Sequence, residues 1–167
     1  MVTPAVHASQ LRSQLVAWAE ELQPAPFVEV IPTEPKVAPS TTGIVCAVIE
    51  GTGQVLPAAS TLAGVSVEII TTIHLYRLVP DSDLSVDDDY ETELTTARDT
   101  LLALLLQDLG LGALTLGSGA EWNVKGAHGG SPLSWGPGWL EDPNEASYRT
   151  QAIQLPAVVF NAWSVTR

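Results

Sequence analysis

The sequence predicts an α+β fold, with two helices packed on one mixed or mainly antiparallel sheet. Two kinds of pattern predict this class. Apolar and mixed positions alternate with the period of a strand in residues 65–79 and again in 148–165, and apolar residues recur at helical spacing in 4–22 and 88–109. A length of 167 residues suits one domain with a substantial buried core, so residues 1–167 are expected to form a single unit.

The first expected element is an amphipathic helix over residues 4–22. Leu11 and Leu15 fall on one side of it, and a proline is tolerated in its first turn. The connection that follows, residues 23–43, contains five prolines, which exclude a continuous helix. We expect a short edge strand, Phe27–Ile31, within this proline-rich connection.

Residues 44–109 are expected to hold the central strands and the main helix. The apolar, β-branched run 43–50 predicts a strand buried on both faces, which Gly51-Thr52-Gly53 should end. Cys46 lies inside this run and, as the single cysteine, is expected to be a buried core residue. The strand at 65–79 exceeds the usual length of roughly five or six residues, so we expect it to bend, to be interrupted or to project beyond its sheet.

An acidic turn at residues 81–89 precedes the second helix, 88–109. Its carboxylates would lie at the positive end of the helix dipole, which explains the run better than a calcium loop does, because the turn glycine of such a loop is missing. The C-terminal half of the helix is apolar almost all round. Leu105 and Leu106 therefore need cover from their own domain or from a neighbouring subunit, and we interpret them as interface residues. Gly110 is an expected C-cap.

The segment 112–143 is rich in glycine, serine, proline and tryptophan, and loops of this length are usually functional. Its tryptophans fit three alternatives: a partner interface, a cap over the protein's own core, or a glycan-stacking surface. His74 and Tyr76 lie on the less apolar face of the long strand. In the closing strand, 148–165, Pro156 implies a bulge, an edge position or a break. The candidate interface residues are Trp122, Trp135, Trp139, His74, Tyr76, Leu105 and Leu106.

Composition and missing motifs argue against several function classes. Nineteen acidic residues against seven basic ones give a net charge of −12, which argues against a DNA-binding surface of clustered Lys and Arg. The longest apolar run, Leu101–Leu106, is too short to span a membrane, and no basic segment followed by an apolar core opens the chain. No phosphate loop, complete dinucleotide fingerprint, metal-ligand spacing or nucleophile elbow occurs. We therefore expect no cofactor, no metal and no catalytic residues.

The order of elements resembles that of the tail terminator proteins of long-tailed bacteriophages. The resemblance is carried by the N-terminal helix, the proline-rich connection, the long strand 65–79, the helix 88–109, the closing strand 150–165 and the acidic balance. It covers most of the chain as a layout of elements. The sequence departs from the family in the segment 112–143, which is longer than the family's usual connection.

The resemblance implies a structural virion protein, made in the host cytoplasm and located at the junction of tail and neck. Such a protein forms a six-membered ring at the head-proximal end of the tail tube, ends tube polymerisation and joins the tail to the head connector. The implied partners are further copies of the chain, the tail tube protein and the connector or stopper protein. DNA would pass through the lumen without sequence-specific binding, and no membrane is involved. The alternatives are another neck or tail component, such as a head completion or tail tube protein, and a glycan-binding module.

Overall fold

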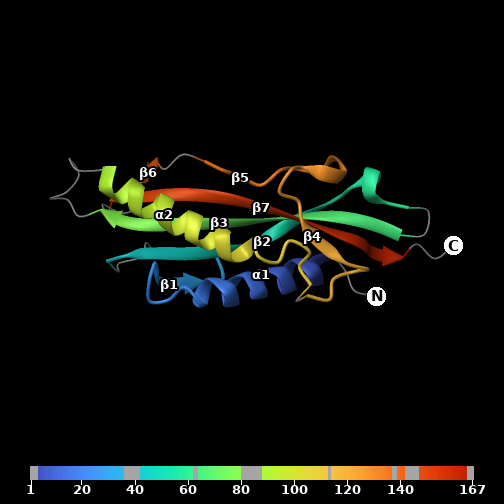
Figure 1. Cartoon of the computed structure of the whole chain (residues 1–167), viewed down its shortest axis with the longest axis horizontal. Helices are drawn as coiled ribbons and strands as arrows, with labels where there is room; N and C mark the ends of the chain where they lie inside the picture. Colours follow the sequence, from blue (N-terminus) through green and yellow to red (C-terminus); the bar gives the residue numbers. More distant parts are fainter. Residues whose placement is uncertain are drawn as a thin grey trace.

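The computed structural model shows two helices packed on one face of a long, mostly antiparallel sheet (Figure 1). It describes residues 4–35, 42–61, 64–79, 88–112, 114–136, 139–141 and 147–164. In chain order the elements are α1 (Pro4–Glu20), β1 (Phe27–Ile31), β2 (Ile44–Val55), the 3-10 turn η1 (Pro57–Ala59), β3 (Gly64–Val79), α2 (Asp88–Leu105), β4 (Ala120–Trp122), the 3-10 turn η3 (Ala127–Gly129), β5 (Ser134–Trp135), β6 (Trp139–Glu141) and β7 (Ser147–Ser164). The predicted α+β class is confirmed.

Three long strands form the centre of the sheet. β2, β3 and β7 have 12, 16 and 18 residues and pair antiparallel with one another. The strand order is β1-β2-β3-β7-β4, with β1 parallel to β2 and with β5 and β6 pairing further along β7. The expected short strand at Phe27–Ile31 is therefore confirmed as one edge of the sheet, and the short strands β4, β5 and β6 share the other edge.

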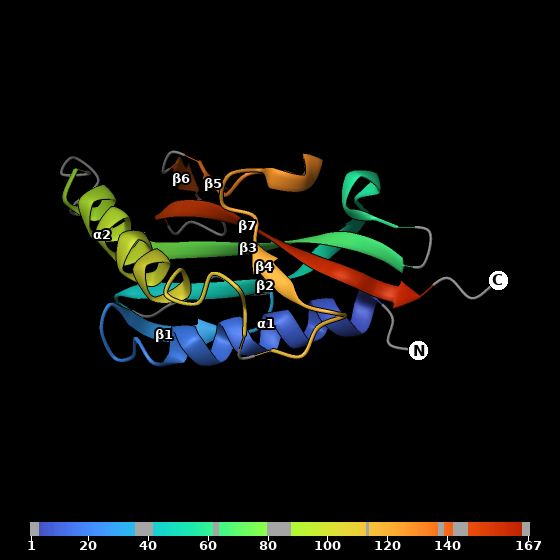
Figure 2. The same cartoon turned by 45° about the vertical axis from the view of Figure 1, so that its right-hand side comes forward.

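Both helices cover the same face of the sheet, as Figure 2 shows from a second direction. Burial of each leucine or isoleucine in this layer contributes roughly 1.5–3 kcal/mol, so the layer supplies much of the stability. Cys46 is fully buried within it, as predicted, and burial raises the pKa of its thiol to about 12. The core residues include Ala8, Leu11, Leu15 and Ala19 of α1, Leu94, Ala97, Leu101 and Leu105 of α2, Cys46 and Val48 of β2, Ile69, Ile73 and Leu75 of β3, and Ile153, Leu155 and Ala157 of β7.

Two predicted strand features need correction. β2 does not end at Gly51-Thr52-Gly53 but continues to Val55 through an irregularity between Ile49 and Thr52. Gly51 suits this place because a methyl group there would meet the Ile70 carbonyl oxygen at 3.0 Å. β3 pairs with β7 along its whole length, with one register shift near its start, so two of its three expected alternatives, an interruption and a projection beyond the sheet, are wrong.

Pro156 lies in the middle of β7, where a proline removes a ladder hydrogen bond. Its carbonyl accepts from the Asn123 amide at 2.9 Å, so its peptide groups face away from β3. On that side β4 ends at Trp122 and β5 begins at Ser134. The proline therefore faces a gap between β4 and β5, although β7 itself lies between β3 and β4; of the three expected alternatives, a local break in the pairing fits best.

The second helix is shorter than predicted. α2 ends at Leu105 rather than at residue 109, and Gly110 is not its cap. The Trp122 indole donates a hydrogen bond to the Leu105 carbonyl at 3.1 Å, and the Trp122 amide donates to Leu109 at 2.8 Å. Hydrogen bonds from Trp122 of β4 thus satisfy the carbonyl groups at the end of the helix, where the sequence predicted a cap at Gly110. Most of the acidic turn, residues 80–87, lies outside the described residues.

Candidate functional site

The tryptophan-rich segment after α2 crosses from the sheet edge onto the face that has no helices. We call residues 123–133 the crossing segment. Its 3-10 turn η3 contacts η1 at the far end of the β2–β3 pair, and both views place these two turns side by side (Figures 1 and 2). The segment returns to the edge where the Leu133 amide donates to the Val124 carbonyl at 3.3 Å and β5 begins.

A buried carboxylate anchors the crossing segment to the sheet. Glu68 of β3 is fully buried on the helix-free face and accepts three hydrogen bonds. The Ser131 amide donates at 2.6 Å, the Asn123 Nδ2 group at 3.2 Å and the Gln54 Nε2 group at 2.5 Å. None of the ion pairs found among the described residues includes Glu68. Its carboxylate is therefore held by neutral amide donors, which bind an ionised acceptor more strongly than a neutral one.

The packing around this carboxylate is tight. A methyl group added to Gly130 would overlap Glu68 Oε1 and lie 2.7 Å from Asn123 Nδ2. Asn123 Nδ2 also donates to the Ser131 carbonyl at 3.1 Å, so one amide group joins the segment to itself and to the sheet. This arrangement fixes the path of the backbone and supplies no nucleophile or general base in contact with solvent.

An apolar pocket of about 520 Å³ opens between the end of α2 and β4. We call it the α2-end pocket. Trp122 is buried beneath it, Leu106 is partly buried, and Leu109 is 55% exposed at its mouth. A single cationic side chain, Lys125, stands among the lining residues. The pocket is lined by Leu106, Leu109, Gly110, Glu121, Trp122, Asn123, Val124, Lys125 and Ala127.

No protein-family model matches the chain, and no curated protein matches its sequence. Within the described part of the chain, no helix is long and apolar enough to cross a membrane. Nor do these described residues bring together three His, Cys, Asp or Glu side chains that could hold a metal ion.

His74 and Tyr76 meet Glu34, which follows β1, on the helix-free face. The Tyr76 hydroxyl donates a short hydrogen bond to Glu34 Oε1 and lies 3.0 Å from His74 Nδ1. The same imidazole nitrogen lies 3.2 Å from Glu34 Oε2. The cluster fastens the proline-rich connection to β3 at Glu34. His74 keeps a quarter of its side chain exposed, whereas Tyr76 is buried in the chain's own fold.

The structure separates the predicted interface residues. Trp122 and Leu105 belong to the chain's own core, so their assignment to an interface is wrong, and the core-cap alternative holds for Trp122. Trp135 is half exposed, and the Arg98 guanidinium lies 4.8 Å from its ring centroid, a favourable cation–π distance. The Trp139 side chain lies outside the described residues. Because Trp122 is buried, the tryptophans do not form a common surface for sugar stacking.

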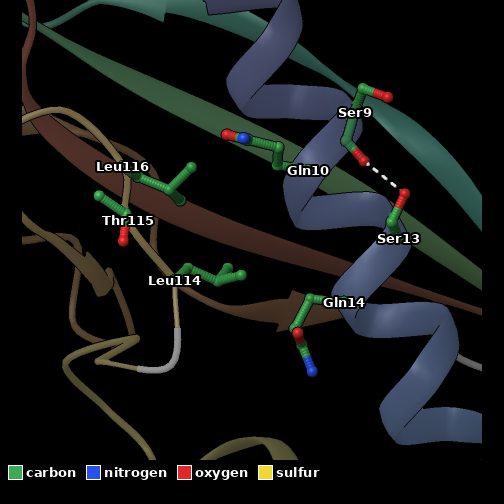
Figure 3. Close-up of a pocket in the computed structure, with 7 residues that line it drawn as sticks. All are labelled: Ser9, Gln10, Ser13, Gln14, Leu114, Thr115 and Leu116. Atoms are coloured by element: carbon green, nitrogen blue, oxygen red, sulfur yellow. Dashed lines mark hydrogen bonds between the residues drawn. The ribbon is translucent and has the colours of Figure 1, made fainter.

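A second hollow, of about 480 Å³, lies between α1 and residues 114–116 (Figure 3). Its hydroxyl and amide groups carry no formal charge, and the Ser13 hydroxyl already donates to the Ser9 carbonyl at 2.9 Å. In Figure 3 Leu114 points toward the helix, across the hollow. The lining residues are Ser9, Gln10, Ser13, Gln14, Leu114, Thr115 and Leu116.

Sequence reasoning missed Glu68, Asn123 and Lys125. The available signal for Glu68 was an acidic residue between Val67 and Ile69 in an otherwise apolar strand. A charge at such a position is rarely buried without partners. No comparable signal marks Asn123 or Lys125, because their importance depends on what the fold brings beside them.

Proposed function

We propose that this protein is a structural component of a phage tail that assembles into a ring at the head-proximal end of the tail tube. There it ends tube polymerisation and joins the tail to the head connector. The proposal is supported by the elements on which the resemblance to tail terminators rests: an N-terminal helix, a long antiparallel strand, a second helix on the same face and a long closing strand.

The observation that carries the proposal is the wide sheet with two different edges. β2, β3 and β7 form the centre, while the edges are β1 on one side and three short strands on the other. A subunit of this shape can associate with its neighbours by unlike surfaces, and such contacts generate a ring when the rotation between subunits closes. The net charge of −12 supports a lumen through which DNA slides, since it repels phosphate.

The test has two parts. Native mass measured from micromolar to high concentration should show a ring, expected to have six members. Tail tube protein polymerised with the chain present should give tubes of limited length that carry the chain at one end. A chain that is strictly monomeric and does not bind tail tubes would overturn the proposal.

The runner-up is another neck or tail component. Localisation in a virion reconstruction separates the two functions, because a terminator lies between the tube and the connector, whereas a tube protein repeats along the tail. A position elsewhere in the virion would replace the terminator assignment by this alternative.

A further inference from the structure

The α2-end pocket combines an exposed apolar side chain with an unpaired cation. Arg12, Arg77 and Arg98 each form an ion pair with a carboxylate, at 2.9, 2.7 and 2.8 Å respectively. Lys125, in contrast, has no hydrogen-bond or ion-pair partner among the described residues, although the chain carries a net charge of −12. Leu109 is 55% exposed beside it. Glu121, the acidic lining residue, lies 2.9 Å from His128 Nε2. The pocket therefore suits a group with an apolar part and a carboxylate that faces Lys125.

The opposite edge of the sheet offers such a group. β1 pairs with β2 through Phe27 and Glu29, and Val28 is the extra residue of a bulge between them. Val28 is 40% exposed, and Glu29 is exposed without an ion-pair partner among the described residues. An apolar side chain and a free carboxylate thus stand next to each other on an edge strand.

We propose that the α2-end pocket of one copy of this chain receives Val28 of a neighbouring copy, with Glu29 of the neighbour facing Lys125. The contact joins unlike surfaces, because β1 and β4 lie at opposite edges of the sheet. One copy cannot fill its own pocket in this way. Each copy instead inserts Val28, at one edge, into a neighbour and receives the Val28 of another neighbour near its other edge. A closed ring requires such contacts between unlike surfaces. The inference rests on the proposed function only in requiring that copies assemble.

The other exposed apolar side chains fit the pocket less well. Val55 is 50% exposed, but its neighbours in the sequence are Gln54 and Leu56, which carry no charge. Trp135 already stacks on Arg98 and is much larger than valine. Charge complementarity with Lys125 therefore selects Val28 and Glu29 as the occupants.

The first test is disulfide trapping between two variants that each add one exposed cysteine, Val28→Cys and Leu109→Cys. Cys46 does not interfere, since it is fully buried and its thiol pKa is about 12. Mixing the two variants under oxidising conditions should give a covalent dimer on a non-reducing gel, while each variant alone should give little. Val55→Cys mixed with Leu109→Cys is the matched control, because Val55 is at least as exposed as Val28.

The second test is charge reversal in the full chain. Lys125→Glu and Glu29→Lys should each weaken assembly by at least roughly tenfold, because like charges would then face each other. The double variant should regain most of the loss, whereas Glu21→Lys, at an exposed acid on a turn, should leave assembly unchanged.

The outcomes distinguish the inference from the proposed function. Trapping by Val28→Cys alone, or equal trapping with the Val55→Cys control, overturns the inference even if the wild type forms rings. Rings that are insensitive to both charge reversals overturn it as well. A wild type that neither assembles nor binds tail tubes removes the proposed function together with the inference.

Discussion

Exchange of Gly130 for alanine gives the most direct test of how the crossing segment is held. Gly130 has an extended backbone, with φ −91° and ψ −174°, which alanine adopts without strain. The cost of Gly130→Ala therefore comes from the methyl group, which would overlap Glu68 Oε1 and approach Asn123 Nδ2 to 2.7 Å. Overpacking of this kind typically costs about 1–3 kcal/mol of unfolding free energy.

Removal of the Glu68 carboxylate should take away most of that cost. In Glu68→Ala, the Ser131 amide loses its 2.6 Å acceptor, which destabilises the fold by about 1–3 kcal/mol. The same change removes the Glu68 atoms that the new methyl group at Gly130 would overlap, whereas Asn123 Nδ2 at 2.7 Å remains. In the Glu68→Ala background, Gly130→Ala should then cost clearly less than in the wild type, because only the approach to Asn123 is left. The expected coupling between the two sites is about 1–3 kcal/mol.

Urea unfolding followed by circular dichroism measures all four free energies. Gly53→Ala is the matched control, since a methyl group there would meet its nearest atom, the Glu68 carbonyl oxygen, at an ordinary 3.8 Å. Its effect should be the same in both backgrounds. If the cost of Gly130→Ala were also equal in the two backgrounds within about 0.5 kcal/mol, the contact with Glu68 would not be what constrains this segment.

Three further predictions concern single residues. Leu105→Ala should cost about 2–5 kcal/mol in urea unfolding because Leu105 is fully buried, and Leu106→Ala should cost clearly less because Leu106 is only partly buried. Tyr76→Phe should lower the unfolding free energy by about 0.5–1.5 kcal/mol, since it removes the hydrogen bond to Glu34. An unchanged stability would show that the contact between Tyr76 and Glu34 does not stabilise the fold. The thiol of Cys46 has a pKa of about 12 in the folded chain against 9.0 when exposed, so above pH 9 the unfolded chain binds fewer protons and stability falls as pH rises. Cys46→Ala should reduce that slope.

The elements with a strong local pattern were predictable from the sequence. Alternation in residues 65–79 located β3 to within one residue. Successive side chains of a strand point to opposite faces of the sheet, so the pattern of apolar residues shows directly which of them face the core. The same reason explains the closing strand, where Pro156 also indicated a bulge, an edge position or a break. Helix spacing located α1 nearly as well, since its start agrees and its end lies at Glu20 rather than at residue 22.

Features that depend on distant partners were not predictable. The end of α2 is set in part by Trp122, which lies 17 residues beyond Leu105 in the chain. Glu68 receives its hydrogen bonds from residues 54, 123 and 131, and no local pattern connects these positions. Burial of Trp122 likewise follows from the strand order, which places β4 against β7 over the helical core.

The two edges of the sheet are protected against uncontrolled strand pairing and still leave defined points at which copies of the chain could associate. A free edge is a template for uncontrolled pairing, and proteins limit this hazard with bulges, charges and short strands. β1 carries a bulge and the charged Glu29, and the other edge is divided among three short strands interrupted opposite Pro156. Such edges resist continuous strand pairing between copies. An association of copies must then use side chains at defined points, and Val28 with Glu29 on one edge and Lys125 with Leu109 near the other are the points where apolar area and opposite charge coincide.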